Sequence, residues 1–235
     1  MKQRMEKEIP EQLSGADVMD MLEISSDVLE NVEFTENKTS VISNNKSYTL
    51  RKHVMDGSFE IYLFNLEFET RQKKSKSDGC NLEVVDLKLN VEDHVYEDLS
   101  QSLQLIVNHH NISGFFILMS TYASWRMKLE KILNSFEEKY PGIAELKSLK
   151  DNKCILQIHV DGHSDFIFII WYSWLVDESF HTTPEVKLGV KVSESLLKED
   201  DSSCIPTSPR IFRKMLEKYD IEHSINTLIN MINPK

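Results

Sequence analysis

The sequence contains little glycine, proline and cysteine, and these shortages exclude several classes of protein. Only 7 glycines and 6 prolines occur in 235 residues, so the chain is neither loop-rich nor of low complexity. Neither a GxxxxGK[ST] nor a GxGxxG motif is present, which predicts that no nucleotide cofactor is bound. The three cysteines, Cys80, Cys154 and Cys204, are not closely spaced, and their odd number suits a reducing compartment rather than a disulfide framework.

Positive charge and long apolar runs are also scarce. The 27 lysines and arginines are outnumbered by 38 aspartates and glutamates, which gives a formal net charge of -11. This charge disfavours direct DNA binding, although a local contact through the lysines at 73–76 is left open. The N-terminal residues lack the apolar segment of a secretory signal, and no run reaches the length of a membrane span. We therefore expect a soluble, intracellular protein that makes no membrane contact.

The most apolar segment of the chain, Phe166–Trp174, is a run of aromatic and β-branched residues. Such a run predicts a strand that is buried on both faces of a sheet. A weaker copy, Phe59–Phe68, lies about a hundred residues earlier. The dipeptides Asp56-Gly57 and Asp161-Gly162 predict a hairpin turn before each run. Strict alternation of apolar and polar residues predicts further strands over 85–91 and 186–192.

Helical spacing of apolar residues follows each set of predicted strands. It predicts helices over 95–106 and 113–140, and a last helix over 221–232. Ser208-Pro209 is typical of the N-cap and first position of a further helix. The polar segment 36–46, rich in Asn, Ser, Thr and Lys, predicts a loop.

The two halves of the chain repeat one order of elements, namely hairpin, apolar strand, alternating strand and helix. This order predicts an α+β fold in which each domain is an antiparallel meander sheet with helices packed on one face. The predicted divisions are a tail and short helix over 1–26, a first domain over 27–112, and a second domain over 113–235 that includes the long inter-domain helix. Sheet edges and one face of each sheet then remain open for partners.

No pattern typical of a catalytic or metal site stands out, and neither GxSxG nor HExxH occurs. His159, Asp161, His163 and Asp165 could form a metal clip across the second predicted turn, but no cysteine or further histidine stands nearby at zinc spacing. Solvated turn residues are the better interpretation of this group, and Cys154 is interpreted as an ordinary strand residue. We predict a protein that is not an enzyme and that holds no metal or cofactor.

Two kinds of surface feature remain. The short helix near the N-terminus has too little apolar surface to stand alone, so Met19, Leu22 and Ile24 must pack on the body of the protein or on another chain. We take these three residues as candidate partner contacts. Thr183 and Ser208 each precede a proline, the pattern of proline-directed kinases. Ser208 is the candidate phosphosite because a phosphate is tolerated at a helix start, with a plain N-cap as the alternative role.

Several segments resemble the centromere protein P family. Trp125–Pro141 resembles the long inter-domain helix of that family. Phe64–Phe68 and Glu83–Leu87 resemble its first sheet, and Phe166–Trp174 followed by Pro184–Leu188 resembles its second. The order and spacing of these segments, rather than any single motif, support the resemblance, which covers roughly residues 28 to 232.

The resemblance implies tandem RWD domains, a fold shared with ubiquitin-conjugating enzymes but without their catalysis. It implies a non-enzymatic structural subunit of the inner kinetochore, in the nucleus, within the constitutive centromere-associated network. It further implies pairing with centromere protein O, and assembly with centromere proteins Q, U and R during kinetochore assembly and chromosome segregation. The alternative is a ubiquitin-conjugating-like protein or another RWD adaptor outside the kinetochore. Family members carry an N-terminal coiled coil, whereas fewer than 30 residues precede the first predicted strand here.

Overall fold

The structure, a computed structural model, describes residues 19, 22, 24–29, 31–73, 82–149, 154–160, 163–200 and 203–232. It divides into two compact units, the first made of Met1–Ser124 and Val176–Thr182 and the second of Trp125–Leu175 and Thr183–Lys235. The elements are α2 (Ser26–Leu29), β1 (Val32–Asn44), β2 (Tyr48–Phe59), β3 (Tyr62–Lys73), β4 (Leu82–Val91), α3 (Asp93–Asn108), α4 (Ile112–Lys139), β5 (Ala144–Ser148), β6 (Cys154–Val160), β7 (His163–Val176), β8 (Thr182–Lys191), α5 (Glu194–Glu199), α6 (Cys204–Leu216) and α7 (Ile221–Ile232).

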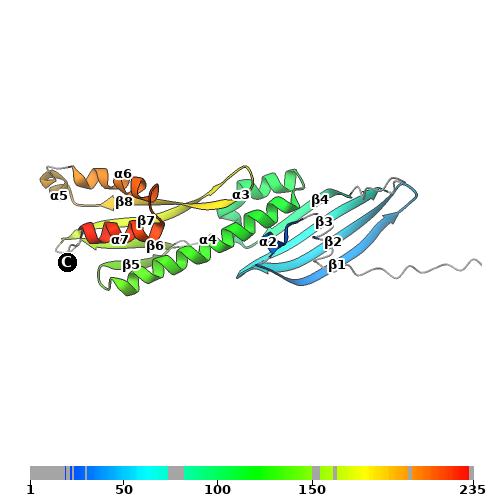
Figure 1. Ribbon diagram of the computed structural model, residues 1–235, viewed down its shortest axis with the longest axis horizontal. Coiled ribbons are helices and arrows are strands. Elements are labelled where there is room, and N and C mark those ends of the chain that lie inside the picture. The colour runs from blue at the N-terminus through cyan, green and yellow to red at the C-terminus, as the bar shows by residue number, and fades with distance from the viewer. Residues whose placement is uncertain are drawn as a thin grey trace, which may run out of the picture. The chain divides into compact units, whose positions relative to one another are not determined.

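Each unit contains one four-stranded sheet (Figure 1), with the strand orders β1-β2-β3-β4 and β5-β6-β7-β8. Successive strands are neighbours and pair antiparallel, which confirms the predicted α+β class and the meander order. The alternating segments 85–91 and 186–192 lie largely in β4 and β8, as predicted. The helix predicted over 113–140 is α4, which contributes residues to both units.

The core of the first unit is built from aromatic rings. Phe115 and Phe116, adjacent residues near the start of α4, pack against Phe59 of β2 and Phe64 of β3. The ring centroids of Phe59 and Phe64 are 5.2 Å apart, and those of Phe59 and Phe116 are 5.6 Å apart. Tilted and edge-on ring pairs of this kind contribute about 0.5–1.5 kcal/mol each beyond the burial of their area. The start of α4 is thereby fixed on the first sheet.

The core of the second unit lies on one face of its sheet. Alternate residues of β6 and β7 are buried there, and α4, α6 and α7 supply the side chains that cover them. Full burial of one large aliphatic or aromatic side chain contributes roughly 1.5–3 kcal/mol. The buried cluster consists of Leu133, Phe136, Ala144, Leu156, Ile158, Phe168, Ile170, Leu188, Phe212, Ile225, Leu228 and Ile229.

The hairpin predicted at Asp56-Gly57 is wrong. Both residues lie inside β2, and the strand continues until Phe59 pairs with Tyr62. The turn therefore lies at residues 60 and 61, where Glu60 has a φ of 54°. Gly57 is needed for a different reason, since atoms of neighbouring strands leave no space for a side chain at this position. For the second predicted hairpin, Val160 pairs with His163, while residues 161 and 162 lie outside the described residues.

The loop predicted over 36–46 is also wrong, because most of this segment belongs to β1. The strand pairs with β2 from Val32 as far as Asn44, with register shifts at 34/36 and 41/43. As an edge strand, β1 is exposed or only half-buried along its whole length, so polar residues are tolerated there. Its register is set by backbone pairing to β2, which a composition rule does not detect. Strand β1 begins at Val32, after α2.

The helix start predicted at Ser208 is wrong as well. Helix α6 begins at Cys204, so Ser208 and Pro209 lie inside it. Pro209 has no N–H to donate to the carbonyl of Ile205, one turn earlier. The hydroxyl of Ser208 donates to that same oxygen at 2.7 Å and takes the place of the missing bond. At the true start of the helix, the carboxylate of Asp200 accepts a bond from the Ile205 N–H at 2.8 Å.

A buried histidine joins three strands of the first sheet. His53 of β2 is 1% exposed. Its Nδ1 lies 3.0 Å from the hydroxyl oxygen of Thr39 in β1, and its Nε2 lies 2.9 Å from that of Thr70 in β3. The ring stacks on Phe68 with centroids 4.7 Å apart. Burial, followed by the nearby charge of Arg51, lowers the pKa of His53 to about 4.

Because the pKa of His53 is lowered in the folded protein, we expect the fold to lose stability in mild acid. Between the ordinary pKa of 6.5 and the folded pKa of about 4, the unfolded chain binds a proton that the folded chain does not. Stability is therefore lost as the pH falls through this window, and solvent screening keeps the total loss on the order of 2 kcal/mol. Urea unfolding measured by circular dichroism at pH 7 and pH 5 tests this, because His53→Gln should flatten the pH dependence. The exposed-residue control His109→Gln should keep the wild-type slope, and equal slopes for both variants would refute the assignment.

Candidate interaction surface

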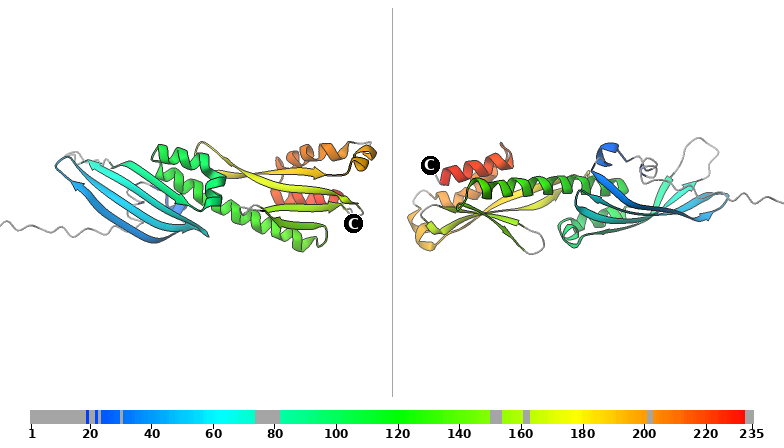
Figure 2. Two further views of the ribbon diagram at one scale, coloured as in Figure 1. Left: turned by 180° about the vertical axis from the view of Figure 1, so that it is seen from behind. Right: turned by 90° about the horizontal axis from the view of Figure 1, so that it is seen from below.

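The helices of the second unit pack on one face of its sheet and leave the other face uncovered. Seen from behind, β6, β7 and β8 lie in front of α6 and α7 (Figure 2, left). Side chains of a strand alternate between its two faces, and the buried positions of β7 are 168 and 170. The residues between them point away from the helices. We call this the outer face and define its apolar part as Ile155, Ile167, Ile169, Trp171 and Leu175.

The apolar part of the outer face is open to solvent in this chain. Trp171 is 38% exposed and Leu175 is 52% exposed, while the three isoleucines are half-buried. The indole of Trp171 lies across Gly189 of the neighbouring β8. A Cβ added to Gly189 would lie 2.8 Å from Cζ3 of that indole, so the glycine provides the space in which the ring lies against the sheet.

A closed group of polar side chains interrupts the apolar part, because Ser173 stands between Trp171 and Leu175 on the same face of β7. Lys187 Nζ is 2.8 Å from Glu185 Oε2 and donates to Ser173 Oγ at 3.2 Å. The hydroxyl of Ser173 in turn donates to Glu185 at 3.3 Å. The bond from Lys187 is the largest cause that lowers the pKa of Glu185, so this carboxylate stays ionised. The outer face therefore combines apolar side chains with an internally paired polar group, and interfaces between proteins commonly combine both.

The outer face of the first sheet has a different character. Glu67 in β3 lies 2.9 Å from Lys52 Nζ in β2 and 3.1 Å from Lys88 Nζ in β4. Hydrogen bonds from both lysines lower the pKa of Glu67. Beside this row, the amide of Asn65 donates to Asp56 at 2.6 Å. Charged rows of this kind are suited to water, whereas the second sheet presents apolar side chains.

The uncovered face corrects the prediction that Phe166–Trp174 is buried on both faces. The side of this strand that carries Phe168 and Ile170 is buried under helices, but the side that carries Trp171 is not. Trp174 belongs to the covered side, where its ring meets Tyr172 with centroids 5.5 Å apart. A meander with helices on one side cannot bury an apolar strand on both sides. The apolar residues on both sides of this strand therefore indicated an uncovered apolar surface, but they were interpreted as burial on both faces.

A cavity of about 790 Å³ also lies in the second unit, along the edge strand β8. Helix α4 supplies Trp125 and Lys128, whose ammonium lies 4.6 Å from the centre of the Trp125 ring. Helix α6 supplies Arg213, and β8 supplies Thr183. The lining also includes Trp171 and Leu175 of the outer face, and it mixes charged with apolar side chains.

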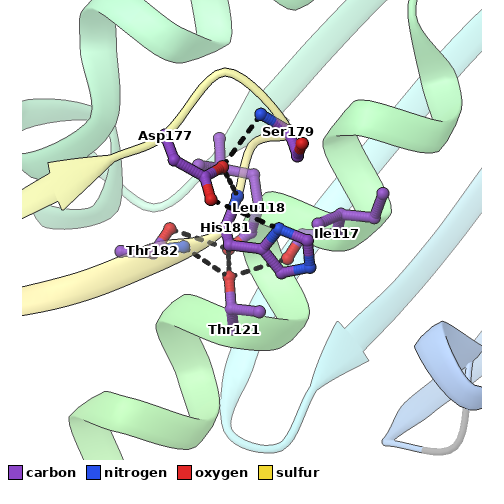
Figure 3. A network of polar contacts seen from close by, with 7 residues as sticks. All are labelled: Ile117, Leu118, Thr121, Asp177, Ser179, His181 and Thr182. Atoms are coloured by element: carbon purple, nitrogen blue, oxygen red, sulfur yellow. Dashed lines mark hydrogen bonds and ion pairs between the residues drawn. The ribbon is translucent and has the colours of Figure 1, made fainter.

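The loop between β7 and β8 belongs to the first unit and is held on α4 (Figure 3). The carboxylate of Asp177 closes the loop by accepting bonds from the N–H groups of Ser179 and His181, at 2.9 and 2.8 Å. The N–H of Thr182 donates to the hydroxyl oxygen of Thr121 on α4 at 2.9 Å. Thr182 itself is 1% exposed. This network is satisfied by bonds within the unit, so we assign it a structural role.

The structure places the three candidate contacts near the N-terminus close together. The N–H groups of Leu22 and Ile24 both donate to the carbonyl of Met19 at 3.1 Å. Met19 is fully buried, Ile24 is 6% exposed and Leu22 is half-buried. Met19 and Ile24 thus pack within the chain, and a role in partner binding stays a prediction. The rest of the predicted short helix lies outside the described residues.

Within the described residues, no group of three His, Cys, Asp or Glu side chains could hold a metal ion. His159 of the predicted clip has Nε2 3.5 Å from Glu145 Oε2. Asp161 and the side chains of His163 and Asp165 lie outside the described part of the chain. Cys154 is a free, half-buried thiol at the start of β6. None of the helices that the structure describes is long and apolar enough to cross a bilayer.

Comparison with known proteins gives one consistent result. The family model for the CENP-A-nucleosome distal (CAD) centromere subunit, CENP-P, matches residues 51–229. The chain is 26% identical to centromere protein P of Gallus gallus over 201 residues, which is 86% of this chain and 69% of that protein. It is 27% identical to centromere protein P of Mus musculus over 203 residues, covering 86% and 68%. For Homo sapiens the identity to centromere protein P is 25% over 200 residues, covering 84% and 69%.

Proposed function

Because the chain belongs to the CENP-P family of centromere subunits, we propose that it is a non-enzymatic structural subunit that pairs with centromere protein O through the outer face. Membership of the family makes the chain a nuclear protein of the centromere and kinetochore. The pairing, and the surface that makes it, are the steps taken beyond the family assignment.

One observation supports the choice of surface. Strand β7 carries large apolar side chains on both sides, but helices cover only one side. Exposed apolar residues gathered on one face cost free energy in water, and monomeric proteins seldom keep such patches without a use. The aromatic and aliphatic side chains of Trp171 and Leu175 are suited to be the central contacts of an interface.

The contrast with the first sheet supports the same choice. Burial of its outer face would desolvate the row formed by Lys52, Glu67 and Lys88, and removing charges from water is costly. Burial of the outer face of the second sheet removes mainly apolar surface from water. Its polar group of Ser173, Glu185 and Lys187 is already internally paired, so fewer charges would be left without a partner.

The proposal includes the fold family and the larger assembly. Each unit has a four-stranded meander with helices on one face, the layer arrangement expected of an RWD domain. We propose two RWD-like domains, 27–112 and 113–235, although the compact units divide α4 at Ser124. In this proposal the pair with centromere protein O joins centromere proteins Q, U and R. The role of this protein in the assembly is then to provide binding surfaces, not to catalyse a reaction.

Co-expression with centromere protein O tests the pairing directly. The two chains should elute together in size-exclusion chromatography, and light scattering should give the mass of one copy of each. The chain expressed alone should be less soluble, because the outer face stays in water. A soluble monomer that fails to bind centromere protein O, in experiments with either protein carrying the tag, would contradict the proposal.

A further inference from the structure

Two hydroxyl residues of this chain precede a proline, and the fold treats them differently. Among the 6 prolines, Pro184 follows Thr183 and Pro209 follows Ser208, while the others follow Ile, Tyr, Ile and Asn. Proline-directed kinases select a Ser or Thr with proline next to it and bind the substrate segment in an extended form. The two positions can therefore be compared by backbone shape, exposure and the bonds of the hydroxyl group.

Ser208 is poorly placed for a kinase. It lies inside α6, so its backbone is helical rather than extended. Its hydroxyl donates to the carbonyl of Ile205 at 2.7 Å, replacing the bond that Pro209 cannot make. A kinase would have to unwind this turn and break that bond, and an unpaired carbonyl would remain. Each of these steps costs free energy.

Thr183 is well placed in backbone shape and in exposure. It lies at the second position of β8, which is an edge strand, so its backbone is already extended and one side of the strand has no neighbouring strand. The side chain is exposed, while Thr182 before it is buried and fixes the strand start. Pro184 has no N–H to contribute to a strand ladder, and edge strands are where proline is tolerated.

We propose that Thr183 is a phosphorylation site for a proline-directed kinase. In the reaction, the hydroxyl oxygen of Thr183 attacks the γ-phosphorus of ATP, and the bond from that phosphorus to the β–γ bridging oxygen breaks. ADP leaves, and the hydroxyl proton passes to the catalytic aspartate of the kinase. The proposal does not depend on the pairing with centromere protein O.

The modification would change the cavity beside β8. A phosphothreonine adds between about 1.5 and 2 negative charges at neutral pH. Thr183, Lys128 and Arg213 all line that cavity, so cationic side chains are present on its α4 and α6 walls. Glu185 stands two positions further along β8, on the same face as Thr183, and is held by Lys187 at 2.8 Å. The phosphate therefore adds negative charge to a cavity whose lining includes the cations Lys128 and Arg213.

The test is to treat the folded, full-length chain with a purified cyclin-dependent kinase and ATP, and to map the phosphate by mass spectrometry. Thr183 should be modified at least tenfold faster than Ser208. The variant Thr183→Val keeps the β-branched shape of an exposed strand residue, so it should fold normally and lose this phosphate. Folding of the variant is checked by circular dichroism.

A synthetic peptide spanning residues 203–214 is the matched control, because it presents Ser208-Pro209 without the helix of the folded protein. The kinase should phosphorylate Ser208 in this peptide, which would show that the fold, and not the sequence, protects the site. Phosphate on Ser208 of the folded chain at a rate equal to that on Thr183, or no phosphate on Thr183, would overturn the proposal.

Discussion

Replacing Gly57 by valine should unfold the first unit under conditions in which the wild-type chain is stable. A Cβ at this position would lie 2.5 Å from the backbone oxygen of Glu33 in the neighbouring β1, and 2.8 Å from Cζ of Phe64. The Phe64 ring is held in the aromatic core, and a backbone oxygen cannot rotate aside. Overpacking of a core commonly costs about 1–3 kcal/mol, and a clash with backbone costs more. We expect a loss of roughly 3 kcal/mol or more, from a total stability of order 5–15 kcal/mol.

Gly142 offers a matched control for this substitution. It has a positive φ of 78°, and a Cβ built there meets nothing within 4 Å. Asparagine tolerates this backbone conformation, so Gly142→Asn should change stability by less than about 1 kcal/mol. Chemical unfolding measured by circular dichroism compares the two variants. If Gly57→Val is as stable as Gly142→Asn, then Gly57 lies in a turn, as the sequence suggested, and the register of β2 is incorrect.

The contrast between these glycines shows what short sequence signals can establish. Asp56-Gly57 has the composition of a hairpin turn, but its local preference is weak compared with twelve residues of β2 paired to β3. The actual turn lies at Glu60, which has a positive φ although it is not a glycine. The register of the two flanking strands holds it in this conformation. Turn signals therefore predicted that a hairpin exists, while long-range pairing decided where it turns.

Long periodic segments were predicted far more reliably. The helix over 113–140 was correct to within one residue at each end, because its apolar stripe extends over many turns and Pro141-Gly142 follows it. The helix start predicted from Ser208-Pro209 was wrong because the preference of one dipeptide is weaker than that of the whole amphipathic helix around it. The prediction for β1 failed because the half-buried side of this edge strand carries polar residues such as Asn37 and Thr39, so it has no apolar period to detect.

The candidate surface could be predicted only in part. The run Phe166–Trp174 was recognised as a strand, and its lack of alternation showed that both sides were apolar. Which side meets helices could not be predicted, since that depends on how α6 and α7 return to the sheet. A core and an interface are made of the same residue types, so only the three-dimensional arrangement separates Ile170 from Trp171.

Replacing Trp171 by aspartate should strongly weaken the pairing with centromere protein O and leave the chain folded. Trp171 is the largest partly exposed side chain of the outer face, and aspartate there would place a charge in the centre of a desolvated contact. Central aromatic residues of interfaces commonly contribute about 2 kcal/mol or more, so we expect an affinity loss of at least about 30-fold. Titration calorimetry with purified centromere protein O measures this loss.

Leu63→Asp is the matched control for that experiment. Leu63 is 61% exposed and lies on the outer face of the first sheet, on the same side of β3 as Asn65 and Glu67. The same change of an exposed apolar residue to aspartate should alter the affinity by no more than about twofold, because the proposed interface does not include this face. Thermal melts of both variants should stay within a few degrees of the wild type, since neither side chain belongs to a buried cluster. Wild-type affinity in a folded Trp171→Asp variant would place the interface elsewhere, and a loss of affinity in Leu63→Asp would move it to the first sheet.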